Sequence, residues 1–196
     1  MHKLAVFASG NGSNFQAIAE AVRSGELYAE IVLVVCDKKQ AYVIERAKSF
    51  GIETFAASPK DFENKSAYEQ AILEQCQGRH VDLIVLAGYM RLVGTTLLSA
   101  YRNKIVNLHP SLLPAFPGLN AIEQAVRAGV KVTGVTVHYV DEGMDTGPII
   151  AQEPVRIYEN DSIDEIEARI HQTEHSLYPK TIANLLEENV QKVREK

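Results

Sequence analysis

Apolar runs typical of buried strands alternate with segments of helical periodicity through the first half of the chain. The runs are Lys3 to Ala8, Glu30 to Val35 and Asp82 to Ala87, and the segments Asn14 to Arg23 and Tyr42 to Phe50 carry apolar residues at helical spacing. Such alternation favours a parallel sheet with right-handed crossovers and helices on both faces. Ligands bind such sheets at the carboxyl ends of the strands, so we expect the functional residues there.

The pattern changes in the second half of the chain. Two β-rich runs, Val132 to Val140 and Pro148 to Ile157, flank a turn-forming segment and indicate an antiparallel strand pair added to the sheet. Ser162 and Glu165 fit a capping box that opens a long C-terminal helix, which Pro179 is expected to kink or interrupt. Between the two halves, we expect strands at Ile52 to Phe55 and Ile105 to His109, and helices at about Asp61 to Cys76, Leu92 to Tyr101 and Leu119 to Arg127.

Length and composition favour one globular domain. The 196 residues are enough for one sizeable core and too few for two large domains. Apolar residues make up 46% and charged residues 23%, which is close to the balance of ordinary folded proteins. We therefore expect a single α/β domain over residues 1–196, with a mostly parallel sheet.

The charge and hydropathy patterns restrict the partners. A net charge of −5 disfavours nucleic acid and anionic membranes, because both attract clustered Lys and Arg. No run approaches the roughly 18 apolar residues of a membrane span, and no basic leader is present, so we expect a cytoplasmic protein that acts on small molecules. Cys36 and Cys76 fit buried apolar positions better than a disulfide or a metal site. The sequence leaves the oligomeric state open, and a homodimer is compatible with it.

Ser9-Gly-Asn-Gly-Ser-Asn14 joins the first expected strand to the first helix. Its glycines and small polar residues place backbone N–H groups at a helix N-terminus, where an anion such as a monophosphate is stabilised. The third glycine of the dinucleotide fingerprint is missing, and no Gly-Lys-Ser/Thr of a Walker motif follows. The alternative interpretation is a tight turn in which Ser13 or Asn14 caps the helix.

A second group of polar residues, Asn107-Leu-His109, ends an expected strand just before Pro110. Alternation along the strand places Asn107 and His109 on one face, so their side chains can converge. An amide and an imidazolium are both donors, and together they can stabilise an oxyanion that forms on a carbonyl carbon under attack. Alternatively, His109 is a capped strand-end histidine and Asn107 a turn residue.

The turn-forming segment contains a third group, Met144-Asp-Thr-Gly-Pro148. An aspartate near His109 favours the protonated imidazole and can relay protons through water, so Asp145 is a candidate partner. The neighbouring acids Asp141 and Glu142 are interpreted as solvated turn residues. His138 is interpreted as a hydrogen-bonded strand histidine rather than a catalyst.

The run Leu86 to Val93 ends a buried strand with a glycine, an aromatic, a thioether and a cation. This combination suits a flat heteroaromatic ring. Without further context it equally suits ordinary core that leads into a helix, with Arg91 reaching solvent.

Five motifs in this order resemble those of the phosphoribosylglycinamide formyltransferases, and the resemblance covers essentially the whole chain. The motifs are Ser9 to Asn14, Leu86 to Arg91, Asn107 to Pro114, Phe116 to Gly118 and Met144 to Pro148. The Asn-x-His-Pro-Ser-Leu-Leu-Pro and Asp-x-Gly-Pro elements are shared with other formyltetrahydrofolate transferases and hydrolases, whereas Gly-Asn-Gly-Ser-Asn is typical of the glycinamide ribonucleotide enzymes. The resemblance implies a Rossmann-like sheet and direct, metal-free transfer of formyl from 10-formyltetrahydrofolate to glycinamide ribonucleotide in de novo purine (IMP) synthesis.

The resemblance also implies roles for individual residues. His109 matches the general acid, Asp145 the residue that favours its protonated form, and Asn107 a donor near the formyl group of the folate. Lys65 stands where related enzymes often have an arginine that touches the folate, so a point charge replaces a planar fork. Gly12, Ser13 and Asn14 match positions that hold the substrate phosphate, Glu174 matches one that contacts the ribose, and Met90, Arg91, Leu92 and Val93 match the folate-ring pocket.

Three other functions compete with this interpretation. Methionyl-tRNA formyltransferases and formyltetrahydrofolate hydrolases share the Asn-x-His and Asp-x-Gly-Pro elements, but they normally carry an additional domain that we do not expect here. The acidic balance also counts against tRNA. A non-catalytic nucleotide-binding module would use the same sheet and phosphate turn, but it would not need His109 and Asp145 together.

Overall fold

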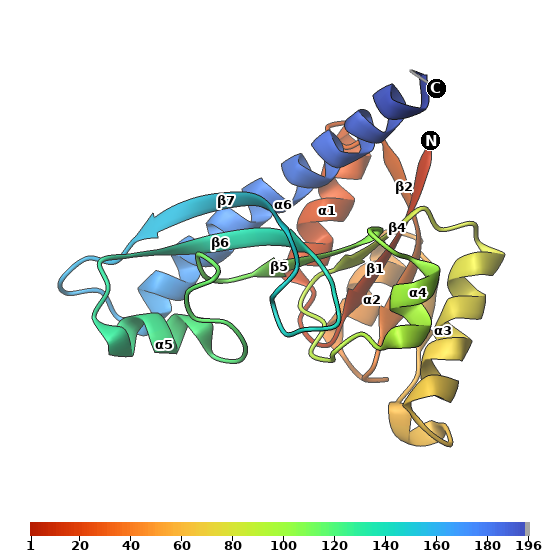
Figure 1. Cartoon of the computed structure of the whole chain (residues 1–196), viewed down its shortest axis with the longest axis horizontal. Coiled ribbons are helices and arrows are strands. Elements are labelled where there is room, and N and C mark those ends of the chain that lie inside the picture. The colour runs from red at the N-terminus through yellow and green to blue at the C-terminus, as the bar shows by residue number, and fades with distance from the viewer. Residues whose placement is uncertain (195–196) are drawn as a thin grey trace.

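A computed structural model describes residues 1–194, and within this range seven strands form one mixed sheet in the order β3-β2-β1-β4-β5-β6-β7 (Figure 1). The first five strands pair in parallel, whereas β6 pairs antiparallel with β5 and β7 antiparallel with β6. The expected single α/β domain with a C-terminal antiparallel pair is therefore confirmed. The strands are β1 (His2–Ala8), β2 (Ala29–Cys36), β3 (Thr54–Ala56), β4 (Leu83–Leu86), β5 (Ile105–His109), β6 (Val132–Tyr139) and β7 (Ile149–Arg156).

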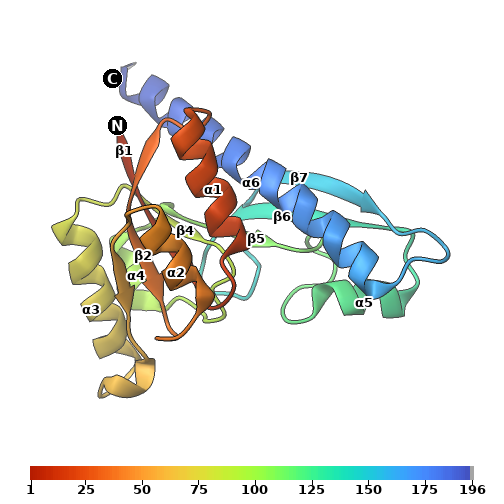
Figure 2. The ribbon, with the colours of Figure 1, turned by 180° about the vertical axis from the view of Figure 1, so that it is seen from behind.

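Helices cover both faces of the sheet (Figures 1 and 2). Leu4 and Val6 of β1 face an apolar cluster that includes side chains of α1, α2 and α6, while Ala5 and Phe7 face a second cluster with α3 and α4. Burial on both faces explains why the central strands are continuously apolar. The helices are α1 (Ser13–Ser24), α2 (Tyr42–Ser49), the 3-10 turn η1 (Pro59–Asp61), α3 (Lys65–Gly78), α4 (Thr95–Ala100), α5 (Ala121–Ala128) and α6 (Ile163–Arg194).

Two helices begin three or four residues later than their periodicity predicts, and the helix expected from Leu119 begins at Ala121. The expected helix from Asp61 starts at Lys65, because the Asn64 side chain accepts the Ala67 N–H at 2.9 Å and caps it there. The expected helix from Leu92 starts at Thr95 after Gly94, which leaves residues 87–94 as a loop at the carboxyl end of β4. This loop becomes part of the site.

Of the two effects expected of Pro179, a kink or an interruption of the last helix, the interruption does not occur. Helix α6 continues through Pro179 and has 32 residues. Within residues 1–194, neither this helix nor another is long and apolar enough to cross a membrane. Tyr178 and Ile182 on either side of the proline are fully buried. The Tyr178 hydroxyl donates to the Leu86 carbonyl at 2.8 Å and the Val106 carbonyl at 3.1 Å. Packing against the sheet therefore outweighs the one backbone hydrogen bond that a proline removes.

The strand order fixes where a ligand can bind. Chain connections leave β1 toward β2 on one side and, after β3, return to β4 on the other, so a crevice opens between the carboxyl ends of β1 and β4. The register pairs Asn107 with His138 and His109 with Thr136 across β5 and β6. Side chains from β5 and β6 are thereby brought together beside the crevice.

Tyr178→Phe should lower the free energy of unfolding by about 1–2 kcal/mol, because two buried carbonyls lose their side-chain donor. Urea denaturation followed by circular dichroism measures the effect. Tyr158→Phe is the matched control, since Tyr158 is 58% exposed and should be neutral. Equal stability of the Tyr178→Phe variant and the unmodified protein would show that these bonds do not anchor α6.

Candidate active site

Four side chains converge at the junction of β5, β6 and the loop that follows β6. His109 Nδ1 lies 3.3 Å from Asp145 Oδ2, and His138 Nε2 lies 3.6 Å from Asp145 Oδ1. Asn107 Nδ2 lies 3.2 Å from His138 Nε2. Both histidines are buried, so these polar groups interact with one another where solvent screening is weak. The structure thus brings Asp145 to Asn107 and His109, which lie together on β5 but far from Asp145 in the sequence.

Asp145 is held by a shaped loop. Its own φ is 56°, and the backbone N–H of Gly118 donates to Oδ2 at 2.8 Å. Gly147 has no room for a side chain, because a Cβ would lie 1.8 Å from the Tyr139 carbonyl oxygen. Burial acts to raise the pKa of Asp145, but the hydrogen bonds from His138 and Gly118 and the charge of His109 outweigh burial and lower it. The carboxylate is therefore ionised at neutral pH.

Both ring nitrogens of His109 have partners. Nε2 lies 2.8 Å from the Phe116 carbonyl oxygen, to which it can only donate, and Nδ1 faces the Asp145 carboxylate. Two acceptors around one ring suit the doubly protonated imidazolium. The Phe116 carbonyl occupies the direction in which Nε2 would donate to a ligand, so a ligand oxygen must take its place.

The turn from Ser9 to Asn14, which the sequence predicts to hold a phosphate, lies at the amino end of α1. No side chain caps this helix, so the N–H groups of its first turn are available to an anion. Gly12 has a φ of 78°, and a Cβ on it would lie 2.5 Å from Val43 Cγ2. Glycine is therefore required for the close packing of the turn against α2, rather than to leave space on the ligand side.

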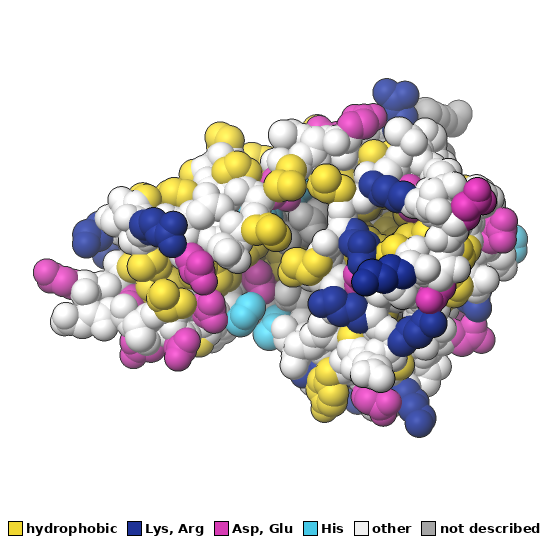
Figure 3. Space-filling view, turned by 90° about the horizontal axis from the view of Figure 1, so that it is seen from below, with side chains coloured by type: hydrophobic (Ala, Val, Ile, Leu, Met, Phe, Trp, Pro, Cys, Tyr) yellow, Lys and Arg dark blue, Asp and Glu magenta, His cyan; other side chains and the backbone are white. Residues whose placement is uncertain are grey.

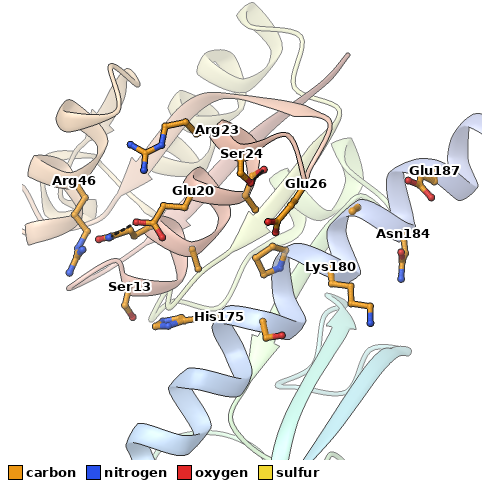
Figure 4. A pocket seen from close by; sticks show the side chains of 16 residues that line it. Ser13, Glu20, Arg23, Ser24, Glu26, Arg46, His175, Lys180, Asn184 and Glu187 are labelled. Atoms are coloured by element: carbon orange, nitrogen blue, oxygen red, sulfur yellow. Dashed lines mark hydrogen bonds between the residues drawn. The ribbon is translucent and has the colours of Figure 1, made fainter.

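Glu174 of α6 faces this turn and is buried. Its Oε2 accepts from Asn14 Nδ2 at 3.0 Å and contacts His171 Nδ1 at 2.9 Å, a hydrogen bond that raises the pKa of His171. Asn14 Oδ1 is buried and has no partner among the described residues. Figure 4 shows Ser13 and His175 near one another at one end of a groove of about 1060 Å³ between α1 and α6.

A second cavity, of about 360 Å³, adjoins the His109 cluster. Its apolar rim includes Met90, Leu92, Leu119 and Met144, whose side chains are at least half exposed. Figure 3 shows this edge of the molecule hollowed, with hydrophobic side chains around the hollow and Lys and Arg side chains gathered to one side. Met90, Arg91, Leu92, Val93, Asn107, His109 and Asp145 all line the cavity.

Two cations of the expected folate site are already paired. Arg91 Nε lies 2.6 Å from the buried Asp37 carboxylate, which holds the loop after β4 against the end of β2. Lys65 Nζ lies 3.7 Å from Glu69, and Lys65 does not line the cavity. The predicted contact between Lys65 and folate therefore stays a prediction.

Comparison with known proteins identifies the family. The profile of the formyl transferase family matches residues 2–182. The phosphoribosylglycinamide formyltransferase of Bacillus subtilis is 62% identical over 186 residues, which are 95% of each chain. A solved structure, that of glycinamide ribonucleotide transformylase 1 from Geobacillus kaustophilus, is 60% identical, covers 95% of this chain and 99% of its own, and superposes with a TM-score of 0.93. The chain belongs to the phosphoribosylglycinamide formyltransferases of the formyl transferase family.

The membership extends to more distant relatives. The phosphoribosylglycinamide formyltransferase of Escherichia coli is 37% identical to this formyl transferase over 180 residues, which are 92% of this chain and 85% of its own. The trifunctional purine biosynthetic protein adenosine-3 of Drosophila melanogaster is 41% identical over 94% of this chain, which corresponds to 14% of its own length. The same unit therefore occurs both alone and within a longer protein.

Sequence reasoning missed one residue of the site of this formyl transferase. His138 is a hydrogen-bonded strand histidine, as expected, because Nδ1 bonds the Tyr139 carbonyl at 2.8 Å. However, Nε2 faces both Asn107 and Asp145, so the ring is also part of the site. The sequence signal for His138 was its position on the strand that leads directly into the Asp145 loop. The register between β5 and β6 decides which face of the sheet the His138 side chain occupies.

Asp145→Asn should flatten the acid limb of the stability curve. Because the pKa of Asp145 is lowered by folding, its carboxylate stabilises the fold above the unfolded-state value of about 3.9, and this contribution is lost as the pH falls through the folded value. The stability difference between the unmodified protein and the variant should therefore shrink from about pH 5 to pH 3, as urea denaturation can measure. Glu142→Gln, in the same loop but exposed, is the control. A difference that stays constant over this range would contradict an ionised Asp145 whose pKa is lowered by folding.

Proposed function

We propose that this formyl transferase moves the formyl group of 10-formyltetrahydrofolate to the amine of glycinamide ribonucleotide, giving formylglycinamide ribonucleotide and tetrahydrofolate in de novo purine (IMP) synthesis. One observation carries the proposal: the His109 cluster lies beside a cavity with an apolar rim, and an uncapped helix N-terminus lies across the crevice. The names of the similar proteins support formyl transfer to glycinamide ribonucleotide.

The two substrates occupy different walls of the site. The ribonucleotide phosphate binds the N–H groups of Gly12, Ser13 and Asn14, where the helix dipole favours an anion. Glu174 is a buried acceptor for a ribose hydroxyl. The folate ring lies against Met90 to Val93, which places its formyl group beside Asn107 and His109.

Formyl transfer then proceeds by direct attack. The amine of the ribonucleotide forms a bond to the formyl carbon, and the carbonyl oxygen becomes an oxyanion that accepts from Asn107 Nδ2 and from His109 after it displaces the Phe116 carbonyl. The proton released by the attacking nitrogen passes through Asp145 and water to N10 of the folate, and the bond from the formyl carbon to N10 breaks. No metal takes part in this mechanism. Much of the acceleration comes from holding both substrates in line.

The remaining elements of the proposal concern the protein as a whole. We expect residues 1–196 to act as one formyltransferase domain in the cytoplasm, on small molecules rather than on nucleic acid or membranes. A homodimer stays compatible with this function.

The experiment that tests the function compares acceptors. The purified protein is given 10-formyltetrahydrofolate with glycinamide ribonucleotide, methionyl-tRNA or water alone, and product is followed by absorbance and mass spectrometry. We expect formylation of glycinamide ribonucleotide only, with or without a chelator. Water as the sole acceptor would indicate a hydrolase, tRNA formylation a different transferase, and restoration of chelated enzyme by a divalent ion would overturn the metal-free mechanism.

His109→Ala and Asp145→Asn should each reduce kcat by roughly 10²- to 10⁴-fold, the range for acid–base and oxyanion contributions, and leave substrate binding little changed. The double variant should lose little more than either single one, because residues that act as a unit are non-additive. Steady-state kinetics with binding measured by calorimetry gives this cycle. Fully additive losses would show that the two residues act independently.

A further inference from the structure

The two walls of the site are joined directly by Ser9, the first residue of the phosphate turn. Its hydroxyl oxygen accepts the Met90 N–H at 2.9 Å, and its own N–H donates to the Gly88 carbonyl at 3.0 Å. Ser9 is 1% exposed. Two hydrogen bonds therefore extend the β1 and β4 pairing past the ends of the strands and into the loop that lines the cavity.

The rest of the phosphate turn is anchored on its other side. The Gly10 carbonyl accepts the Val43 N–H at 3.1 Å, and Arg46 donates to the Asn11 carbonyl at 2.8 Å. These bonds tie the turn to α2, which lies away from the folate wall. Loss of the Ser9 hydroxyl therefore leaves the turn attached to α2 and loosens its side-chain link to Met90.

We infer that Ser9 is a positioning residue that fixes the separation between the ribonucleotide phosphate and the folate ring. The inference rests on the proposed function, because it concerns the alignment of those two substrates. Ser9 does not line the cavity beside the His109 cluster. It acts through Met90 on one side and through the turn on the other, and a change of about 1 Å in such an alignment can cost roughly 100-fold in rate.

The first test separates turnover from binding. Ser9→Ala should reduce kcat at saturating substrates by about 10- to 100-fold, while the Kd of each substrate measured alone changes by less than about threefold. Thr181→Val is the matched control, because it removes a buried hydroxyl whose 2.7 Å bond to Leu177 lies within α6. This control should leave kcat unchanged.

Three outcomes would overturn the inference. Ser9→Ala with kcat within about threefold of the unmodified enzyme would show that alignment does not depend on the hydroxyl. A loss of affinity for one substrate as large as the loss of kcat would make Ser9 part of a single subsite. An equal loss of kcat in Thr181→Val would show that the loss in Ser9→Ala comes from general destabilisation of the fold.

Hydrogen exchange on the unmodified enzyme gives a test that does not depend on folding of a variant. Glycinamide ribonucleotide alone should slow exchange of the Met90 amide by about fivefold or more, the lower end of typical coupling between sites. The Gly94 amide lies in the same loop and donates to Glu69 at 2.7 Å. Its exchange rate should change less, so it serves as the internal reference. Unchanged Met90 exchange in an enzyme that formylates the ribonucleotide would overturn the inference and leave the proposed function intact, whereas absence of formylation would overturn the function itself.

Discussion

The Asp145 side chain is only 13% exposed, and the loops around it place donors that compensate its charge. An ionised group in such a position is stable only where donors replace the lost solvent. His109, His138 and the Gly118 backbone supply them from three segments of the chain. The same contacts orient the His109 ring, so one electrostatic requirement fixes both the loop after β6 and the candidate acid.

The loop that carries the Phe116 carbonyl is fixed by a second buried network. Thr136 Oγ1 donates to the Ser111 carbonyl at 2.6 Å and accepts from Leu113 N and from Gln152, both at 3.0 Å. Thr136 lies opposite His109 in the ladder between β5 and β6. Strand β6 therefore has two roles in the site. It carries His138, and through Thr136 it holds the loop whose Phe116 carbonyl bonds His109.

The crevice between β1 and β4 has two chemically different walls. On one wall the uncapped end of α1 offers backbone donors for an anion, and on the other an apolar loop suits a flat ring. Neither wall alone is specific to formyl transfer. The proposed reaction needs both walls together with the His109 cluster, at the edge of the sheet where the strands end.

The sequence by itself determined the α/β class, the parallel core, the antiparallel pair and the segments that reach the site, because buried strands must be apolar and turns need glycine and small polar residues. It also singled out Asn107, His109 and Asp145 by residue type and motif. Only the tertiary structure decided that His138 joins them, that Gly12 is required by Val43, that α6 passes through Pro179, and that Lys65 lies off the cavity. Those outcomes depend on strand register and on packing between segments distant in the chain, and such contacts leave no local pattern in the sequence.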